Sequence, residues 1–188
     1  MLDPVLESDL IFVLAGDDAR KRHGLKLFRD HAAKRIILST GRFEIRRLSQ
    51  LSLPAPIDLL TLAAPIPPEQ RHFFVCFEEN GVSAERIPLK RFGTLSEVEA
   101  LALWLANRSH ILSVTIISTR FHLPRIAMCC KALLPQGIHF SLIPTPELDS
   151  SGQWYSFRKV RVFLTEGTKE LVKILAYWFL LSYPNKRS

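Results

Sequence analysis

Short apolar runs alternate with helical patterns along this chain, and that alternation constrains its fold more than any other feature. Residues 10–14, 35–39 and 114–118 are dominated by leucine, isoleucine, valine and phenylalanine. Runs of this length are typical of strands that are buried on both faces. Helices are expected after the first of them, over residues 19–31, and from His122 onward after the third. Repeated strand-helix units predict a parallel sheet that is covered on both faces.

Prolines and glycines divide the middle of the chain. A basic helix over residues 42–50 and a strand over residues 57–62 are expected first, because the prolines that bracket the strand cannot extend a ladder. Pro67-Pro68 then fits the start of a helix with Glu69 in its first turn, and Asn80-Gly81 fits its end.

Thr94 and Glu97 stand three residues apart, before apolar residues that recur at helical spacing. This spacing matches a capping box, in which the two side chains bind backbone amides at the helix start. The capping box alone accounts for both residues, and a catalytic role for Glu97 is the alternative. A strand over residues 138–143 completes the alternation.

The chain has 188 residues, with no internal repeat and no low-complexity linker. Its hydrophobic content of 47%, with 23% charged residues, is typical of globular proteins. We therefore expect residues 1–188 to form one domain. Cys76, Cys129 and Cys130 lack metal-ligand spacing, and we interpret them as reduced core thiols in a reducing compartment.

The net charge of +7 favours an anionic partner, such as a phosphorylated small molecule, an acidic membrane surface or nucleic acid. A solvated, soluble surface explains the same charge equally well. The basic residues are dispersed and no nucleic-acid-reading motif is present, so specific nucleic-acid binding is not expected.

A candidate site follows the strand over residues 114–118. Ser118 and Thr119 end this strand, and His122 and Arg125 open the next helix. In an open parallel sheet, ligands bind outside the carboxyl ends of the strands, where helix N-termini offer N–H groups to anions. A guanidinium matches phosphate or carboxylate, and an imidazole exchanges protons near neutral pH. We therefore predict anion binding here, with His122 as acid or base. A helix-start histidine that binds backbone and an arginine paired with a structural carboxylate are the alternatives.

The ends of the first two strands offer further ligand contacts. Ser39, Thr40 and Gly41 end the second strand, where small residues let backbone amides approach a phosphate. Gly16 and Arg20 follow the first strand, and Arg20 could reach the same place. An ordinary tight turn explains Ser39, Thr40 and Gly41 almost as well, and a solvated helix charge explains Arg20 almost as well.

Several other kinds of site are not expected. The chain lacks a Gly-x-x-x-x-Gly-Lys-Ser/Thr loop, a Gly-x-Gly-x-x-Gly fingerprint and a Gly-x-Ser-x-Gly elbow. The other histidines are scattered without paired ligand spacing, so no metal site is predicted. Asp17-Asp18 could hold magnesium beside a phosphate, but helix capping is the favoured interpretation.

Several of these positions occur in a distinctive order. They are Gly16, Arg20, Ser39-Thr40-Gly41, Glu69, Gly81-Val82, Thr94 with Glu97, Ser118-Thr119-Arg120-Phe121-His122-Leu123-Pro124-Arg125, and Trp154 with Glu166-x-x-Lys169. In this order they resemble the SanA/ElyC/YdcF-like family of bacterial proteins over most of the chain. The turn Ala15-Gly16-Asp17 departs from the three glycines frequent in that family, and the segment over residues 43–67 is longer than usual.

The resemblance implies a three-layer, Rossmann-like α/β domain with a mainly parallel sheet of about five strands, in the order 3-2-1-4-5. It implies ligand contacts at Glu69 and Thr94 besides the positions already considered. It also associates the chain with cell-envelope biogenesis, as an enzyme that acts on a phosphorylated or nucleotide-like small molecule. The alternative is a non-catalytic regulatory module that binds a nucleotide or S-adenosylmethionine. Cofactors and oligomeric state are left open.

The apolar runs near both ends are too short to span a membrane. Without an N-terminal signal or anchor, a cytoplasmic location is expected, with weak peripheral contact to an anionic membrane surface as a further expectation. Leu171, Leu175, Trp178 and Phe179 recur at helical spacing. We expect them to pack against the sheet, and a helix lying on the membrane is the alternative.

Overall fold

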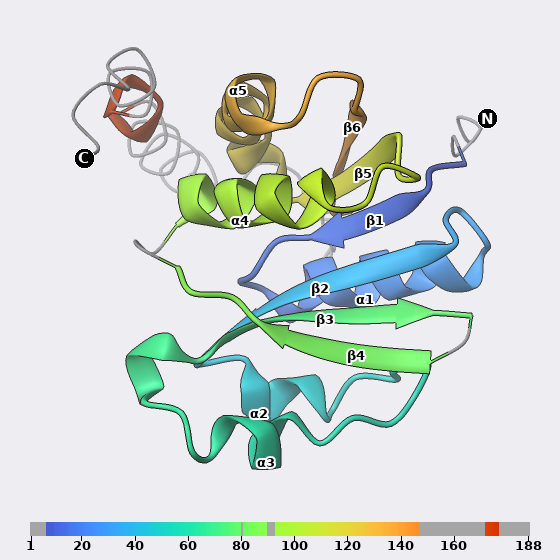
Figure 1. Ribbon diagram of the computed structural model, residues 1–188, viewed down its shortest axis with the longest axis vertical. Coiled ribbons are helices and arrows are strands. Elements are labelled where there is room, and N and C mark those ends of the chain that lie inside the picture. Colours follow the sequence, from blue (N-terminus) through green and yellow to red (C-terminus); the bar gives the residue numbers. More distant parts are fainter. Residues whose placement is uncertain (1–6, 80, 90–92, 147–171, 177–188) are drawn as a thin grey trace, which may run out of the picture.

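In the computed structural model, residues 7–79, 81–89, 93–146 and 172–176 are described. They contain one six-stranded sheet with the strand order β4-β3-β2-β1-β5-β6 (Figure 1). The strands are β1 (Leu10–Val13), β2 (Arg35–Gly41), β3 (His72–Glu78), β4 (Gly81–Arg86), β5 (Ser113–Ser118) and β6 (His139–Pro144). β2, β1, β5 and β6 pair in parallel, whereas β3 pairs antiparallel with β2 and β4. The α/β class is confirmed, but the sheet has one strand more than expected and is mixed.

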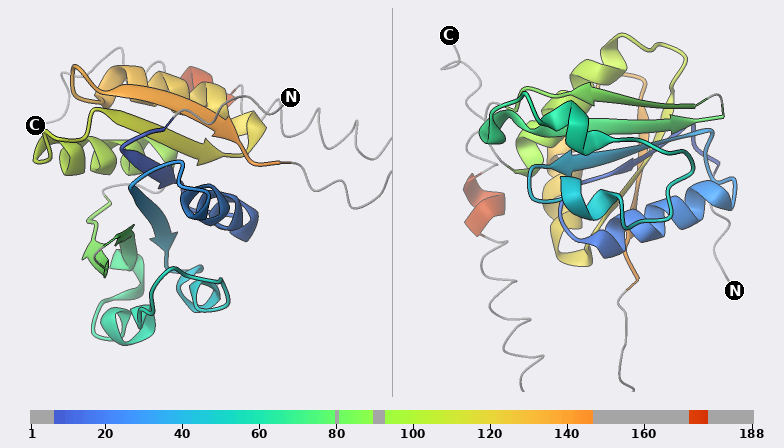
Figure 2. Two further views of the ribbon diagram at one scale, coloured as in Figure 1. Left: turned by 90° about the vertical axis from the view of Figure 1, so that its right-hand side faces the viewer. Right: turned by 90° about the horizontal axis from the view of Figure 1, so that it is seen from below.

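Helices cover both faces of the sheet. The helices are α1 (Asp18–Arg29), α2 (Ile45–Leu48), α3 (Leu59–Ala63), α4 (Thr94–Ala106) and α5 (Leu123–Leu133), with 3₁₀ turns η1 (Pro68–Gln70) and η2 (Arg120–His122). One apolar cluster joins α4 and α5 to the sheet, and a second joins α1, α2 and α3 to its other face. In the left view of Figure 2, α4 and α1 lie on opposite sides of β1 and β2. The sheet therefore has a core on each face.

The expected helix between Pro67-Pro68 and Asn80-Gly81 is wrong, because most of it is strand β3. Its phenylalanine-rich run is buried on both faces, with Phe74 in the α4–α5 cluster and Phe73 in the α1 cluster. Continuous burial of this kind hides the alternation that would distinguish a strand from a helix. Asn-Gly is also a hairpin signal, and β3 and β4 pair as a hairpin.

The strand expected over residues 57–62 is also wrong. Helix α3 occupies this place, and the Asp58 side chain accepts a hydrogen bond from the Thr61 amide at its start. An N-cap of this kind favours a helical turn over an extended chain. The expected basic helix over residues 42–50 is reduced to α2.

Helix caps differ in part from the expectation. Asp17 caps α1, because its carboxylate accepts a hydrogen bond from the Ala19 amide. The capping box at Thr94 is wrong, since the N-cap of α4 is Gly93 and no side chain caps the helix. Glu97 is therefore available for contacts outside its own helix.

The pleat of the sheet directs three polar side chains toward α4 and α5. Successive residues of a strand face opposite sides, so Ser39 lies on the same face as Ile37, and Ser118 on the same face as Ile116. His72 pairs with Gly41 and shares the face of Phe74. This edge, where β1, β2 and β5 end, holds the candidate site.

Within the described residues no helix is long and apolar enough to cross a membrane. The helical residues 172–176 include Leu175, whose side chain is exposed. The expected burial of Leu175 is therefore wrong, because this turn presents it to solvent. Leu171, Trp178 and Phe179 lie outside the described residues.

Candidate functional site

A cavity of about 440 Å³ lies at the carboxyl ends of β1 and β5, beside the first turns of α4 and α5. Many of the predicted site residues line it, namely Gly16, Arg20, Thr94, Glu97, Ser118, His122 and Arg125. Lys173 also contributes to its wall and was not predicted from the sequence. The cavity thus combines three basic side chains, one histidine and one carboxylate.

Arg20 is buried and held in a fixed orientation. Its guanidinium donates to the Ala15 carbonyl at 2.7 Å and to the Thr119 hydroxyl at 3.2 Å. Gly16 has a φ of +132°, and an added Cβ would lie 2.9 Å from the guanidinium. Only glycine allows this close approach of turn and arginine. Burial lowers the pKa of Arg20, although neighbouring carboxylates oppose this shift and arginine remains charged at neutral pH.

Arg125 and His122 lie one helical turn apart and contact each other. Arg125 Nη2 lies 3.2 Å from His122 Nδ1. Because a guanidinium only donates hydrogen bonds, Nδ1 of His122 accepts, which assigns the proton of the neutral ring to Nε2. His122 is thereby oriented as a hydrogen-bond donor through Nε2.

Ser118 ends β5 on the cavity wall and is fully buried. Its Oγ has no hydrogen-bond partner among the described residues. A buried hydroxyl without a partner costs about 1–3 kcal/mol, so such groups are uncommon in structural positions. Its position on the wall leaves this hydroxyl as a hydrogen-bonding group for a molecule in the cavity.

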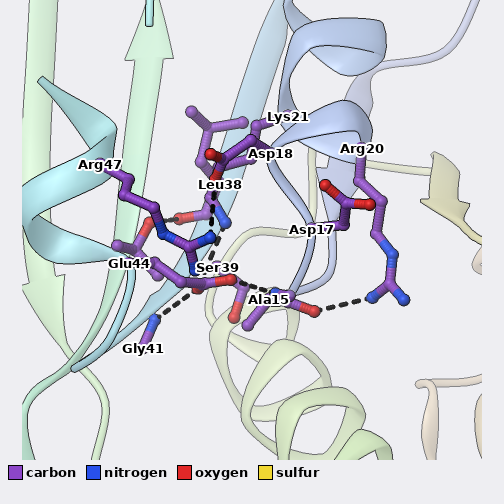
Figure 3. A network of polar contacts seen from close by, with 12 residues as sticks. Ala15, Asp17, Asp18, Arg20, Lys21, Leu38, Ser39, Gly41, Glu44 and Arg47 are labelled. Carbon is purple, nitrogen blue, oxygen red and sulfur yellow. Dashed lines mark hydrogen bonds and ion pairs between the residues drawn. The ribbon is translucent and has the colours of Figure 1, made fainter. Parts of the chain in front are cut away.

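Glu44 binds one backbone amide that follows β1 and one at the end of β2 (Figure 3). Its carboxylate accepts hydrogen bonds from the amides of Gly16 and Gly41 and pairs with Lys21 Nζ at 3.2 Å. The approach of a phosphate to the Gly41 amide that the sequence predicted is therefore wrong, because a carboxylate of the chain already binds this amide and that of Gly16. Sequence reasoning missed Glu44 and Lys21, since a glutamate in a basic segment and a lysine in a basic helix resemble solvated charges.

A second buried network connects three elements. Ser39 Oγ donates to Glu97 Oε1 at 2.5 Å and lies 2.7 Å from His72 Nε2. The Ala15 amide donates to the same Oε1 at 2.9 Å. Burial raises the pKa of Glu97, while hydrogen bonds and nearby cations oppose the shift. His72 was missed because its segment was predicted to be a helix.

His72 is neutral in this network. Burial lowers its pKa to about 4, even though Glu44 favours the charged form. If Ser39 donates to Glu97, its oxygen accepts from His72, so the imidazole proton lies on Nε2. The hydrogen bonds then run in one direction, from His72 through Ser39 to Glu97.

The remaining predicted residues lie outside the cavity wall. Thr40 is buried on the α1 face and donates to the Leu38 carbonyl. Thr119 contributes through its contact with Arg20. Glu69 is exposed on η1, and no hydrogen bond or ion pair within the described part of the chain joins it to the site. Among the described residues, no group of three or more metal-ligating side chains is placed to hold a metal ion.

No protein-family model, curated protein or solved structure matches this chain.

The three cysteines are free and buried, consistent with core thiols. Burial raises the pKa of Cys130 to about 12 and that of Cys129 to about 11, so neither thiol ionises near neutral pH.

Proposed function

We propose that this protein binds a phosphorylated or nucleotide-like small molecule in the cavity between β1, β5 and the starts of α4 and α5. The observation that carries the proposal is the convergence of Arg20 and Arg125 on one cavity with the Ser118 hydroxyl, which has no hydrogen-bond partner in the part of the chain that the structure describes. Charge-assisted donors and a hydroxyl are the groups that bind phosphate oxygens.

The helices add to this preference for an anion. α4 has 13 residues and α5 has 11, and at neither does the side chain of the N-cap residue, Gly93 or His122, bind a backbone amide of the helix. The first amides of α4 lie at the cavity, since Gly93 and Thr94 contribute to its wall. At α5 the amides of His122 and Leu123 bind carbonyls of the preceding turn and Pro124 has no N–H, so α5 contributes through its dipole. The partial positive charge of a helix N-terminus stabilises a negative ligand by typically about 0.3–1 kcal/mol.

The chemistry that we propose for this site is proton transfer at a phosphate-bearing ligand. In its neutral form His122 presents Nε2–H, a hydrogen-bond donor that stabilises a leaving oxygen. To protonate that oxygen, the ring must first gain a proton on Nδ1 in place of the Arg125 contact, and it returns to the neutral form when the proton is transferred. Arg20 and Arg125 hold the anion during that step. The resemblance to the SanA/ElyC/YdcF-like family further suggests a lipid-carrier or sugar-nucleotide pathway of the cell envelope.

The same resemblance suggests a Rossmann-like origin for part of the sheet. β2, β1, β5 and β6 are neighbours in parallel, and we propose that they form this part. The β3–β4 hairpin is then an addition to one edge, which supplies His72 to the site.

A non-catalytic module that binds a nucleotide or S-adenosylmethionine is the second candidate. Glu97 favours it, because a buried carboxylate on the cavity wall beside the strand ends suits the hydroxyl groups of a ribose. Extraction of metabolites from the purified protein, followed by incubation, distinguishes the candidates. Conversion of the bound compound supports the enzyme, and its recovery unchanged supports the module.

The first prediction tests anion binding. Arg125→Ala should weaken binding of inorganic phosphate and of ADP by about 1.5–3 kcal/mol, because a charge-assisted contact is lost. Calorimetric titration at low and high salt measures this, and wild-type affinity should fall as salt rises.

Arg22→Ala is the matched control, since Arg22 is exposed on α1 and away from the cavity wall. Circular dichroism establishes that both variants are folded. Unchanged affinity in folded Arg125→Ala would remove this residue from the site.

The basic net charge also leads us to propose weak contact with anionic membranes. Co-sedimentation with phosphatidylglycerol vesicles, but not with phosphatidylcholine vesicles, and loss of binding in high salt are expected. Equal binding to both kinds of vesicle would contradict an electrostatic contact.

A further inference from the structure

Glu97 is an unusual group to find in a cavity that binds anions. Its side chain is almost completely buried, and it lines the same cavity as Arg20, Ser118 and Arg125. An ionised carboxylate repels phosphate and sulfate alike unless a proton lies between them. Its presence therefore needs a reason beyond charge balance.

The buried network determines how Glu97 can interact. Both of its hydrogen bonds from the described residues, from the Ala15 amide and the Ser39 hydroxyl, fall on Oε1. Neutral His72 keeps the Ser39 hydroxyl directed toward Glu97. Oε2 is thus the oxygen left to contact a ligand, and an ionised carboxylate can only accept a hydrogen bond.

This acceptor distinguishes anions by their own protons. A phosphate monoester has a second pKa near 6, and that of inorganic phosphate is about one unit higher, so close to neutral pH both offer a P–OH group. Sulfate is fully ionised and offers no donor. A site built to accept a hydrogen bond strongly disfavours an analogue that lacks the donor, because the buried polar group is left unpaired.

We propose that Glu97, oriented by Ser39 and His72, makes this cavity selective for protonated phosphate groups over sulfate. The inference rests on the proposed function and adds to it the class of ligand, a phosphate or phosphate monoester rather than any oxyanion. Glu97 is the specificity-determining residue, and Ser39 and His72 are positioning residues.

The test compares inorganic phosphate with sulfate by calorimetric titration of the full chain at pH 6.5 and equal ionic strength. Wild-type protein should bind phosphate at least about 30-fold more tightly than sulfate, the scale of one buried hydrogen bond. Glu97→Gln offers an amide N–H to sulfate, so its sulfate affinity should rise and the ratio should fall below about threefold.

Glu99→Gln is the matched control, because it removes the same charge two residues along α4 at a position outside the cavity wall. Glu99→Gln should keep the wild-type ratio of phosphate affinity to sulfate affinity. Equal affinity of wild-type protein for the two anions would overturn the inference and leave the proposed function standing. Failure of wild-type protein to bind phosphate or ADP would overturn both.

A pH series provides a readout that does not depend on a variant. Burial raises the pKa of Glu97, so acidification protonates it earlier than an ordinary glutamate, and sulfate affinity of the wild type should rise. The charged and titratable groups around Glu97 are Arg20 and Lys21 on α1, Glu44, His72 on β3, His122 and Arg125 at the start of α5, and Lys173 on the cavity wall. The Glu97→Gln variant keeps all of these groups. Its sulfate affinity should therefore rise less on acidification than that of wild-type protein, because it lacks the protonation of Glu97. Parallel pH curves for the two proteins would contradict the selective role of Glu97.

Discussion

At the scale of single residues, the buried Lys21–Glu44 pair holds together the two turns beside the site. Glu44 binds the amides of Gly16, which follows β1, and of Gly41, which ends β2, while Lys21 supplies the opposing charge from α1. Burial lowers the pKa of Lys21, and Glu44 limits that shift. Removing one member of such a pair leaves the other charge uncompensated in the interior.

Glu44→Ala should therefore lower the free energy of unfolding by about 3–5 kcal/mol, as measured by urea denaturation. Asp30→Ala is the control, because it breaks the exposed Lys26–Asp30 pair and should cost less than about 1 kcal/mol. Equal losses of stability in the two variants would contradict this prediction, because they would mean that the buried Lys21–Glu44 pair contributes no more than an exposed ion pair.

At the scale of elements, α1 lies directly against β1. An added Cβ at Gly24 would approach Val13 Cγ2 to 2.4 Å. Val13 is itself buried in the cluster that joins α1 to the sheet, so it has little space to move. Gly24 therefore sets the distance between helix and strand and, through it, the position of Arg20 beside the cavity.

Gly24→Ala should decrease stability by about 1–3 kcal/mol through overpacking, although alanine normally stabilises a helix interior by about 1 kcal/mol relative to glycine. Thermal unfolding monitored by circular dichroism measures whether the substitution raises or lowers stability. Arg22→Ala on the exposed side of the same helix should change stability by less than about 0.5 kcal/mol. A stabilised Gly24→Ala protein would mean that helix and strand are less tightly packed than described.

At the scale of the whole molecule, the site makes stability depend on pH. His72 is neutral when folded, with a pKa of about 4 against an ordinary 6.5. The unfolded chain therefore binds a proton first, and the folded state loses stability as the pH falls from about 6.5 to about 4. Glu97 acts in the opposite sense, because burial raises its pKa and its protonation is favoured in the folded state.

Wild-type protein should accordingly lose up to about 3 kcal/mol over this pH range relative to His72→Gln, which has no imidazole to protonate. Glutamine retains an N–H donor for Ser39, so the network can persist at neutral pH. Urea denaturation of both proteins at a series of pH values measures the difference. A constant difference across the series would show that His72 does not titrate in this range.

Much of the fold and part of the site follow from local sequence. Hydrophobic runs at β1, β2 and β5 predicted three strands of the parallel part of the sheet, because a strand buried on both faces needs such a run, and a further run predicted the partly buried β6. The carboxyl ends of parallel strands share one edge, which is why Arg20, Ser118, His122 and Arg125 could be predicted to meet there.

Only the tertiary structure decided which groups the strand-end amides and Glu97 would contact. Glu44 lies 28 residues from Gly16, and His72 lies 33 residues from Ser39, so neither pairing leaves a periodic signal in the sequence. The hairpin of β3 and β4 was missed for a related reason, since a continuous apolar run does not distinguish a buried strand from a helix. Local patterns determine which segments become strands and helices, whereas long-range packing in a buried, desolvated edge determines which polar groups become partners.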